Sequence, residues 1–278
     1  MAVYGHDTVK PLPVDPVQMI AIDLDGTLLR SDSTIGLASI DAIRSACARG
    51  VRVVLATARP PRGVSAFYTQ LGLDTLQINH NGALIYDQGR REATRHLPLE
   101  GELARKVVKT ARRIAPKISI GVDVVDTLYT DRKDADLPLS GADVQSATGS
   151  LDRVLNQPVT KIFMSDKSNV LADIQMSVQQ RFSGRVAFAT SHMRLLQIVR
   201  GGVDKSVALA EVAKHYRVDA PGIMAIGDAP NDLGMLKWAG LAVAVKNAWS
   251  DVLKAAHFVV PSNDEDGVAE AIQRYVLI

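Results

Sequence analysis

Two aspartates at the end of an apolar run are the first residues that point to chemistry. Residues 20–32 read IAIDLDGTLLRSD, so Asp23 and Asp25 follow a stretch of strand length and lie two positions apart. Burying one unpaired carboxylate is costly, and a second like charge beside it adds to that cost. We therefore expect other groups to compensate these two side chains.

Three further groups of polar residues follow or begin predicted elements. Thr57 comes just after a second buried strand, in LATAR, and Lys205 opens a helix in GGVDKSVAL. Asp228 and Asp232 come just after a later apolar strand, in GDAPND. Residues that follow the strands of a parallel sheet gather at one edge, where such folds place their sites. These side chains are therefore expected to converge in space.

The converging carboxylates predict a magnesium site. Asp23, Asp228 and Asp232 provide an oxygen-rich pocket, and the backbone carbonyl of Asp25 is placed to complete it. Mg²⁺ takes carboxylates, waters and substrate phosphate oxygens as ligands. Together with the Lys205 ammonium, the metal is expected to offset the clustered negative charge and let a phosphate dianion approach.

The same residues predict the steps of phosphate-ester hydrolysis. Asp23 is expected to attack phosphorus and form an aspartyl-phosphate. Asp25 is expected to protonate the leaving alcohol and then to remove a proton from the attacking water. Thr57 is expected to donate a hydrogen bond to a phosphoryl oxygen, while Lys205 neutralises phosphoryl charge and holds Asp23 in place.

The elements that carry these residues alternate between strands and helices. QMIAIDL and VRVVLAT read as buried strands separated by a helix, and LQINHNGALIYD as a strand that runs into a turn. The alternation returns from KSVALAEVAKHYRV onward and is typical of a parallel, doubly wound α/β sheet. The intervening residues mix alternating stretches with two long helical segments, which predicts an inserted α+β unit. We expect a discontinuous core of residues 1–83 and 191–278 and an insert of residues 84–190.

Seven short motifs, spread over nearly the whole chain, carry a family resemblance. They are DLDGTLL, LATAR, NGALIYD, DKSVAL, GDAPNDLGML, VAVKNA and DEDGVAEAI. In this order and at these spacings, the chain resembles the haloacid dehalogenase superfamily and, within it, the Cof-like branch of sugar-phosphate phosphatases. The resemblance implies a Rossmann-like core, a mobile inserted cap, and Mg²⁺-dependent hydrolysis of phosphomonoesters through an aspartyl-phosphate. Ala58 and Ser206 stand where the family usually has glycine, but neither departure removes a functional group.

Residues beside these motifs are candidates for binding the phosphate group. Arg59 is expected either to contact the substrate or to pair with a carboxylate, and Asn231 to orient either the substrate or Asp228. Asn81 and Gly82, in NHNGA, form the turn into the cap or also line the phosphate side. The candidate set for phosphate binding is Gly26, Thr57, Ala58, Arg59, Asn81, Gly82, Lys205 and Asn231.

Other polar segments are interpreted without a role in the chemistry. The proline-containing residues 1–16 are expected to be a flexible lead-in, and the polar residues 131–150 a loop within the insert. Asp123 and Asp126, also in the insert, are interpreted as surface residues of the cap. No sequence pattern in these segments indicates one particular substrate.

Composition limits the partners of the protein. The 278 residues are 47% hydrophobic and 22% charged with a net charge of +2, which favours a large folded core over disorder. The sequence has no dense Lys/Arg tract with interleaved aromatic residues, so it does not predict nucleic-acid binding. It also has no apolar run that approaches the roughly 18 residues of a membrane span. A single cysteine, Cys47, excludes an internal disulfide and favours a reducing, cytoplasmic location. No pattern indicates an oligomeric state.

Three functions share this constellation of residues. The first is a phosphatase that acts on a small phosphorylated metabolite such as a sugar phosphate. The second is a phosphotransferase such as a phosphomutase, which hands the phosphoryl group to a sugar instead of water. The third is a phospho-acceptor module or phosphate-ligand sensor, against which Asp25 argues because a long-lived aspartyl-phosphate has no use for an acid/base. Release of free phosphate distinguishes the first function from the second.

Overall fold

The computed structural model describes residues 16–131, 146–148, 150–166, 168–192 and 194–278. The predicted lead-in and most of the predicted loop at 131–150 lie outside the described residues. Among the helices of the described ranges, none has the length and apolar character needed to cross a membrane.

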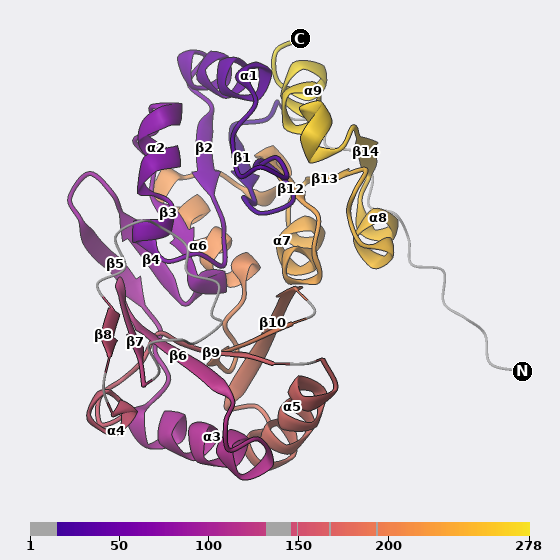
Figure 1. The fold of residues 1–278 in the computed structure, drawn as a ribbon. Coiled ribbons are helices and arrows are strands. Elements are labelled where there is room, and N and C mark those ends of the chain that lie inside the picture. Colours follow the sequence, from indigo (N-terminus) through magenta and orange to yellow (C-terminus); the bar gives the residue numbers. More distant parts are fainter. Residues whose placement is uncertain (1–15, 132–145, 149, 167, 193) are drawn as a thin grey trace, which may run out of the picture.

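A parallel sheet forms the centre of the larger unit, in the order β14-β13-β12-β1-β2 (Figure 1). All residues of β1, β12 and β13 are buried. Such continuous burial is expected for parallel strands that are covered on both faces. This confirms the α/β doubly wound sheet predicted from the sequence. The strands are β1 Met19–Ile22, β2 Arg52–Leu55, β12 Ile223–Gly227, β13 Leu241–Val245 and β14 Phe258–Val260.

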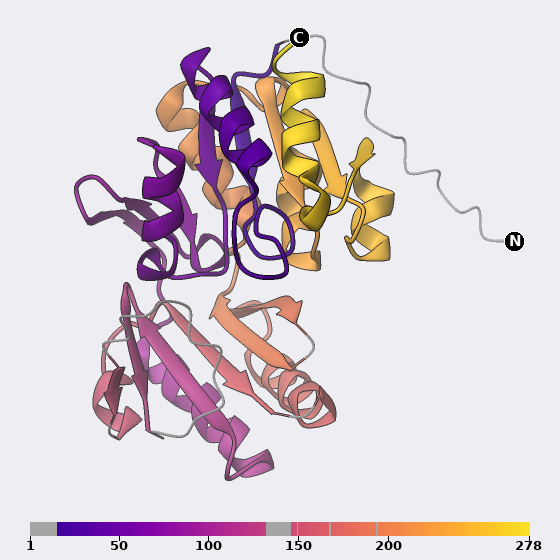
Figure 2. The same cartoon turned by 45° about the horizontal axis from the view of Figure 1, so that its top comes forward.

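Helices cover both faces of this sheet. α1 packs beside α2 and α9 on one face, and α6 packs beside α7 on the other; Figure 2 shows α1 and α9 in front of the strands. The helices of this unit are α1 Leu37–Ala48, α2 Ser65–Leu71, α6 Lys205–Tyr216, α7 Leu233–Trp238, α8 Ser250–Ala255 and α9 Gly267–Tyr275. The short 3₁₀ turns are η1 Pro61–Gly63, η2 His80–Gly82, η3 Ala220–Gly222, η4 Pro230–Asp232 and η5 Asn263–Glu265.

The segment LQINHNGALIYD forms two strands instead of the single strand expected. β3 (Gln77–Asn79) and β4 (Leu84–Asp87) pair antiparallel, and β5 (Glu92–His96) adds to β4. The chain reverses between β3 and β4 because His80, Asn81 and Gly82 have φ values of 51°, 58° and 96°. Three consecutive left-handed residues turn the backbone sharply, and an apolar pattern does not reveal them.

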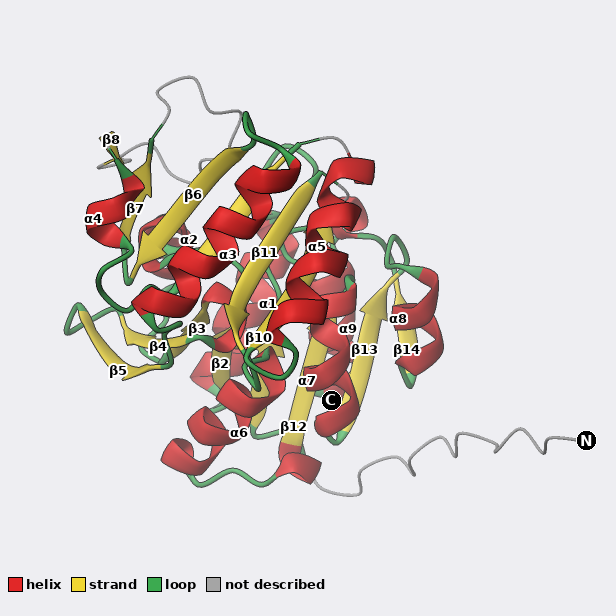
Figure 3. Ribbon diagram, turned by 90° about the horizontal axis from the view of Figure 1, so that it is seen from below, coloured by secondary structure: helices red, strands yellow, loops and turns green. Residues whose placement is uncertain are grey.

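A second sheet belongs to the other unit and has the order β10-β11-β9-β6-β7-β8. Its neighbouring strands are antiparallel except for β7 and β8. Helices α3 and α5 lie side by side over one face, as Figure 3 shows from below. The elements are α3 Gly101–Ile114, β6 Ser119–Val124, β7 Thr127–Thr130, β8 Ser146–Thr148, α4 Leu151–Val154, β9 Lys161–Ser165, α5 Ser168–Phe182, β10 Val186–His192 and β11 Leu195–Arg200.

Each unit has its own apolar core. One core lies between the parallel sheet and its helices, and the other between the six-stranded sheet and the two long helices α3 and α5. A small apolar cluster of Ala83, Val199 and Val203 lies where the chain passes between the units. The remaining face of the six-stranded sheet turns toward the parallel sheet (Figure 1). The domain boundaries at residues 83/84 and 190/191 stay a prediction.

Replacing Gly82 with alanine should destabilise the fold more than the same change at Gly72. A Cβ on Gly82 would lie 2.2 Å from the backbone oxygen of Asp204, whereas a Cβ on Gly72 would meet nothing within 4 Å. Both glycines have left-handed φ values, which cost an alanine roughly 1 kcal/mol. The clash should bring the loss in free energy of unfolding to about 2–4 kcal/mol for Gly82→Ala. Urea unfolding measures both variants, and equal losses would contradict the expected clash.

Candidate active site

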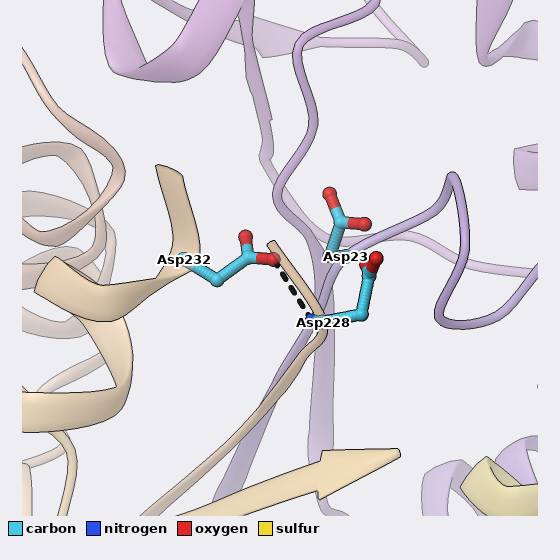
Figure 4. A group of neighbouring side chains, drawn as sticks. All are labelled: Asp23, Asp228 and Asp232. Carbon is cyan, nitrogen blue, oxygen red and sulfur yellow. Dashed lines mark hydrogen bonds between the residues drawn. The ribbon is translucent and has the colours of Figure 1, made fainter. Parts of the chain in front are cut away.

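The predicted polar residues meet at the edge of the parallel sheet where β1, β2 and β12 end. Asp23 and Asp25 follow β1, Thr57 follows β2, and Asp228 follows β12. Figure 4 shows the side chains of Asp23, Asp228 and Asp232 beside one another. The arrangement results from the parallel strands, whose carboxyl ends all point to this edge.

A buried ammonium group joins two of these carboxylates. Lys205 Nζ donates to Asp23 Oδ1 at 2.5 Å and to Asp232 Oδ1 at 2.6 Å. Asp23, Asp232 and Lys205 are 4%, 0% and 1% exposed, so their charges interact with little screening by water. Burial alone would lower the pKa of Lys205, but the attraction of the two carboxylates outweighs it and raises that pKa above its usual value.

Local hydrogen bonds fix the residues that carry these charges. Asp204 caps helix α6 by accepting from the backbone amides of Ser206 and Val207, so Lys205 is the first helical residue. Asp232 Oδ2 accepts from the amides of Asp228 and Ala229 at 3.1 and 3.0 Å. The turn after β12 therefore holds Asp232 by one carboxylate oxygen while the other accepts from the lysine.

Asp228 packs against the loop that follows β1. Thr27 Oγ1 donates to Asp228 Oδ1 at 2.7 Å. Gly26 has φ +84°, and a Cβ there would lie 2.6 Å from Asp228 Oδ2. A side chain at position 26 would therefore occupy the space that the carboxylate uses. The glycine of the DLDGT motif is needed for this close approach as well as for the turn.

The three carboxylates form a group that fits a divalent cation. One oxygen from each of Asp23, Asp228 and Asp232 lies within 4.8 Å of the others. Burial and the repulsion of Asp232 raise the pKa of Asp23 well above its usual value, although Lys205 opposes the shift. Burial and the same repulsion raise the pKa of Asp228 to about 6. The single positive charge of Lys205 does not compensate three carboxylates. Because Mg²⁺ prefers oxygen ligands of this kind, a bound Mg²⁺ would fit the group.

The loop after β2, which we call the Thr57 loop (residues 57–63), faces the loop after β1. Thr57 is fully buried, and its Oγ1 accepts from the backbone amide of Arg59 at 3.1 Å. Arg59 forms a bidentate ion pair with Asp25, with Nε to Oδ2 at 2.8 Å and Nη2 to Oδ1 at 2.5 Å. Of the two alternatives expected for Arg59, the structure has the pairing with a carboxylate.

Asn81 and Gly82 lie beside the Thr57 loop, because the Asn81 amide donates to the Thr57 backbone oxygen at 3.0 Å. Asn231 Nδ2 donates to Asn81 Oδ1 at 3.0 Å, so these asparagines pair with each other across two loops. Asn231 Oδ1 is buried and has no hydrogen-bond partner. Gly82 packs against the backbone of Asp204, directly before Lys205. Gly82 therefore lies against the backbone at the start of helix α6, which positions Lys205.

The second unit contributes buried polar residues that the sequence analysis missed. Lys161 Nζ, from β9, donates to the backbone oxygen of Ala58 at 2.8 Å. Arg62 Nη2 donates to Asp123 Oδ1, also at 2.8 Å. Asp123 is 1% exposed, so its interpretation as a surface residue was wrong, while Asp126 is half-buried and accepts from the Arg62 amide. A lone lysine beginning the apolar run KIFM was the available signal for Lys161.

Comparisons with known proteins agree with this arrangement. A sequence model of the haloacid dehalogenase-like hydrolase family matches residues 20–272. The chain is 31% identical to the 5-amino-6-(5-phospho-D-ribitylamino)uracil phosphatase YitU of Bacillus subtilis, over 92% of this chain and 97% of that protein. The phosphatase YcsE of the same organism, named for the same substrate, is 27% identical over 94% and 96%. A haloacid dehalogenase-like hydrolase structure from Bacteroides thetaiotaomicron is 28% identical, covers 93% of this chain and 99% of its own, and has a TM-score of 0.82.

Replacing Asp228 with asparagine should stabilise the metal-free protein at high pH. A carboxyl whose folded pKa is raised to about 6 from 3.8 favours folding below about pH 4, and this contribution is lost as pH rises through 6. At pH 8, Asp228→Asn should therefore gain on the order of 2–3 kcal/mol over the wild type, and the gain should vanish near pH 4. Urea unfolding in chelator from pH 4 to 8 measures it.

Asp41→Asn is the matched control, because Asp41 is exposed on α1 and lies outside the group. It should leave the pH dependence of unfolding unchanged. A difference between Asp228→Asn and the wild type that stays constant across this pH range would contradict the charge argument.

Proposed function

The chain belongs to the haloacid dehalogenase-like hydrolases, and from this premise we propose that it hydrolyses a small phosphomonoester through an aspartyl-phosphate on Asp23. The observation that carries the proposal is the buried Lys205 ammonium between Asp23 and Asp232 at the end of β1. A lysine in that position holds the nucleophile and offsets part of the charge that a phosphate dianion would meet.

Asp23 is the proposed nucleophile and Asp25 the proposed acid/base. An oxygen of Asp23 attacks phosphorus, and the bond between phosphorus and the ester oxygen breaks with its electron pair on that oxygen. Asp25 gives its proton to the departing alcohol. Water then attacks the aspartyl-phosphate, loses a proton to Asp25, and releases inorganic phosphate and the Asp23 carboxylate.

Thr57 and Asn231 are proposed to bind the phosphoryl oxygens. The Thr57 hydroxyl accepts from the Arg59 amide and retains its own proton to donate. Asn231 Nδ2 donates one of its two hydrogens to Asn81 Oδ1, so the other N–H is the donor proposed for a phosphoryl oxygen. Two glycines of the candidate set, Gly26 and Gly82, support the site by allowing close approach of the backbone. Ala58 supports it as part of the Thr57 loop.

Mg²⁺ is the proposed cofactor, held by Asp23, Asp228 and the backbone carbonyl of Asp25. Asp232 adds charge to the same group while its oxygens hold Lys205 and the turn after β12. When bound there, Mg²⁺ would polarise a phosphoryl oxygen and screen the carboxylates from the incoming dianion.

The substrate is proposed to be a small phosphorylated metabolite, and the cap of residues 84–190 to select it. The two Bacillus subtilis relatives are named for a phosphorylated ribitylaminouracil, which supports a sugar or sugar-like phosphate. The six-stranded sheet turns a face toward the site, so closure of the cap would exclude water around the leaving group. We place the enzyme in the cytoplasm, where such metabolites occur.

Asp23→Asn should abolish phosphate release, because an amide oxygen cannot act as the nucleophile. Release of inorganic phosphate is measured over a panel of sugar phosphates and p-nitrophenyl phosphate, with Mg²⁺ and with chelator. The wild type should need the metal, and the variant should lose about 10⁴-fold or more in kcat.

Asp41→Asn, on the surface of α1, should retain wild-type rates in the same assay. Metal-independent release that survives Asp23→Asn would show that the site is misassigned. An isomerised sugar phosphate without free phosphate would identify a mutase instead.

A further inference from the structure

We infer that Lys161, in the cap sheet, is a positioning residue that holds the Thr57 loop and thereby orients Asp25. The inference rests on the acid/base role proposed above for Asp25. It assigns to the cap an effect on the chemical step in addition to the selection of substrates.

Lys161 reaches the catalytic loop from the first position of β9. Its side chain is 7% exposed, and Nζ lies 2.8 Å from the backbone oxygen of Ala58. Gln197 Oε1, on the neighbouring strand β11, accepts from the same ammonium at 3.4 Å. Asp123 Oδ2, on the other neighbour β6, lies 3.7 Å away. The ammonium is thus held between two cap strands and directed at one carbonyl of the core.

The residue after that carbonyl is Arg59, which holds Asp25. Its guanidinium makes two hydrogen bonds to the Asp25 carboxylate and lies over the ring of Phe67, 5.4 Å from the centroid. The backbone oxygen of Arg59 accepts from the amide of His80 and from Asn79 Nδ2. Because Lys161 fixes the peptide unit joining residues 58 and 59, it also limits where the guanidinium can lie.

The cap holds the same loop at a second point. Arg62 donates its backbone amide to Asp126 Oδ1 at 2.7 Å and its guanidinium to Asp123 Oδ1 at 2.8 Å. Cap contacts therefore lie on both sides of Arg59, at Ala58 and at Arg62. Asp123 is common to both, since it faces Lys161 as well as Arg62. The loop position that orients Asp25 is thus set with the cap in place.

Packing alone does not account for a lysine at this position. Removing an ammonium from water is costly, and burial lowers the pKa of Lys161 despite the nearby Asp123. A methionine would fill similar space without that desolvation cost, and Asp123 would keep its ion pair with Arg62. What the methionine lacks is the hydrogen bond to Ala58, so the donor is the feature that the site uses.

Lys161→Met is tested with phenyl phosphate and p-nitrophenyl phosphate, which have nearly the same shape. Phenolate is the poorer leaving group and needs a proton from Asp25, whereas p-nitrophenolate departs without much help. Lys161→Met should lower kcat/KM, which reports formation of the aspartyl-phosphate and not its hydrolysis, about 10- to 100-fold with phenyl phosphate and less than about 3-fold with p-nitrophenyl phosphate. Asp25→Asn should show the same selective loss, and a purely structural defect would lower both rates alike.

Amide hydrogen exchange in residues 57–63 gives a readout that needs no activity. The loop should exchange faster in Lys161→Met and at the wild-type rate in Lys106→Met, a matched control on the exposed side of α3. Lys161→Gln, which retains an N–H donor, should lie closer to the wild type in both measurements. It also serves if the methionine variant does not fold.

An equal loss of activity on both esters, or unchanged amide exchange in the loop, would overturn the inference about Lys161. The proposed function would still stand in that case, provided that the wild type releases phosphate. No phosphate release by the wild type from these esters or from the panel of sugar phosphates would instead contradict the proposed function. In that case, the exchange measurement alone decides whether Lys161 holds the loop.

Discussion

The buried ion pair of Lys205 with Asp23 and Asp232 is the constraint on which the rest of the site depends. Carboxylates this close together repel one another strongly where water does not screen them. The lysine allows them to remain side by side, and it must arrive from a helix that begins at the same sheet edge. The Asp204 cap, the left-handed Gly82 and the turn after β12 all serve to bring that helix start and those strand ends together.

The two units meet through polar contacts as well as apolar ones. Each unit buries its own apolar residues. Between the units, ion pairs and hydrogen bonds join β6, β9 and β11 of the six-stranded sheet to loops of the unit with the parallel sheet. When the units separate, polar contacts are replaced by hydrogen bonds to water, so less free energy is lost than at an apolar interface. An interface of this kind can therefore open and close. The junction therefore suits the closure of the cap that we proposed above.

Much of the fold and the site could be predicted because both follow from the strands. Apolar runs mark β1, β2 and β12, and the parallel order of these strands brings Asp23, Thr57 and Asp228 together. The hairpin of β3 and β4 could not be predicted, because it depends on left-handed backbone at His80 and Asn81. The burial of Asp123 was also missed, since its partners Arg62 and Lys161 come from distant parts of the chain and neither spacing nor periodicity links them.

The pairing of β1 with β12 has a consequence for how the protein is made. Met19 lies opposite Ile223, so the strand that leads to Asp23 has one of its two neighbours far along the chain. During synthesis, all residues of the six-stranded unit are made before those of β12, and the unit is a continuous segment with its own apolar core. It can fold first and bring the two halves of the parallel sheet near each other. Assembly of Asp23 with Lys205 is then a late event, governed by the closure of one long loop.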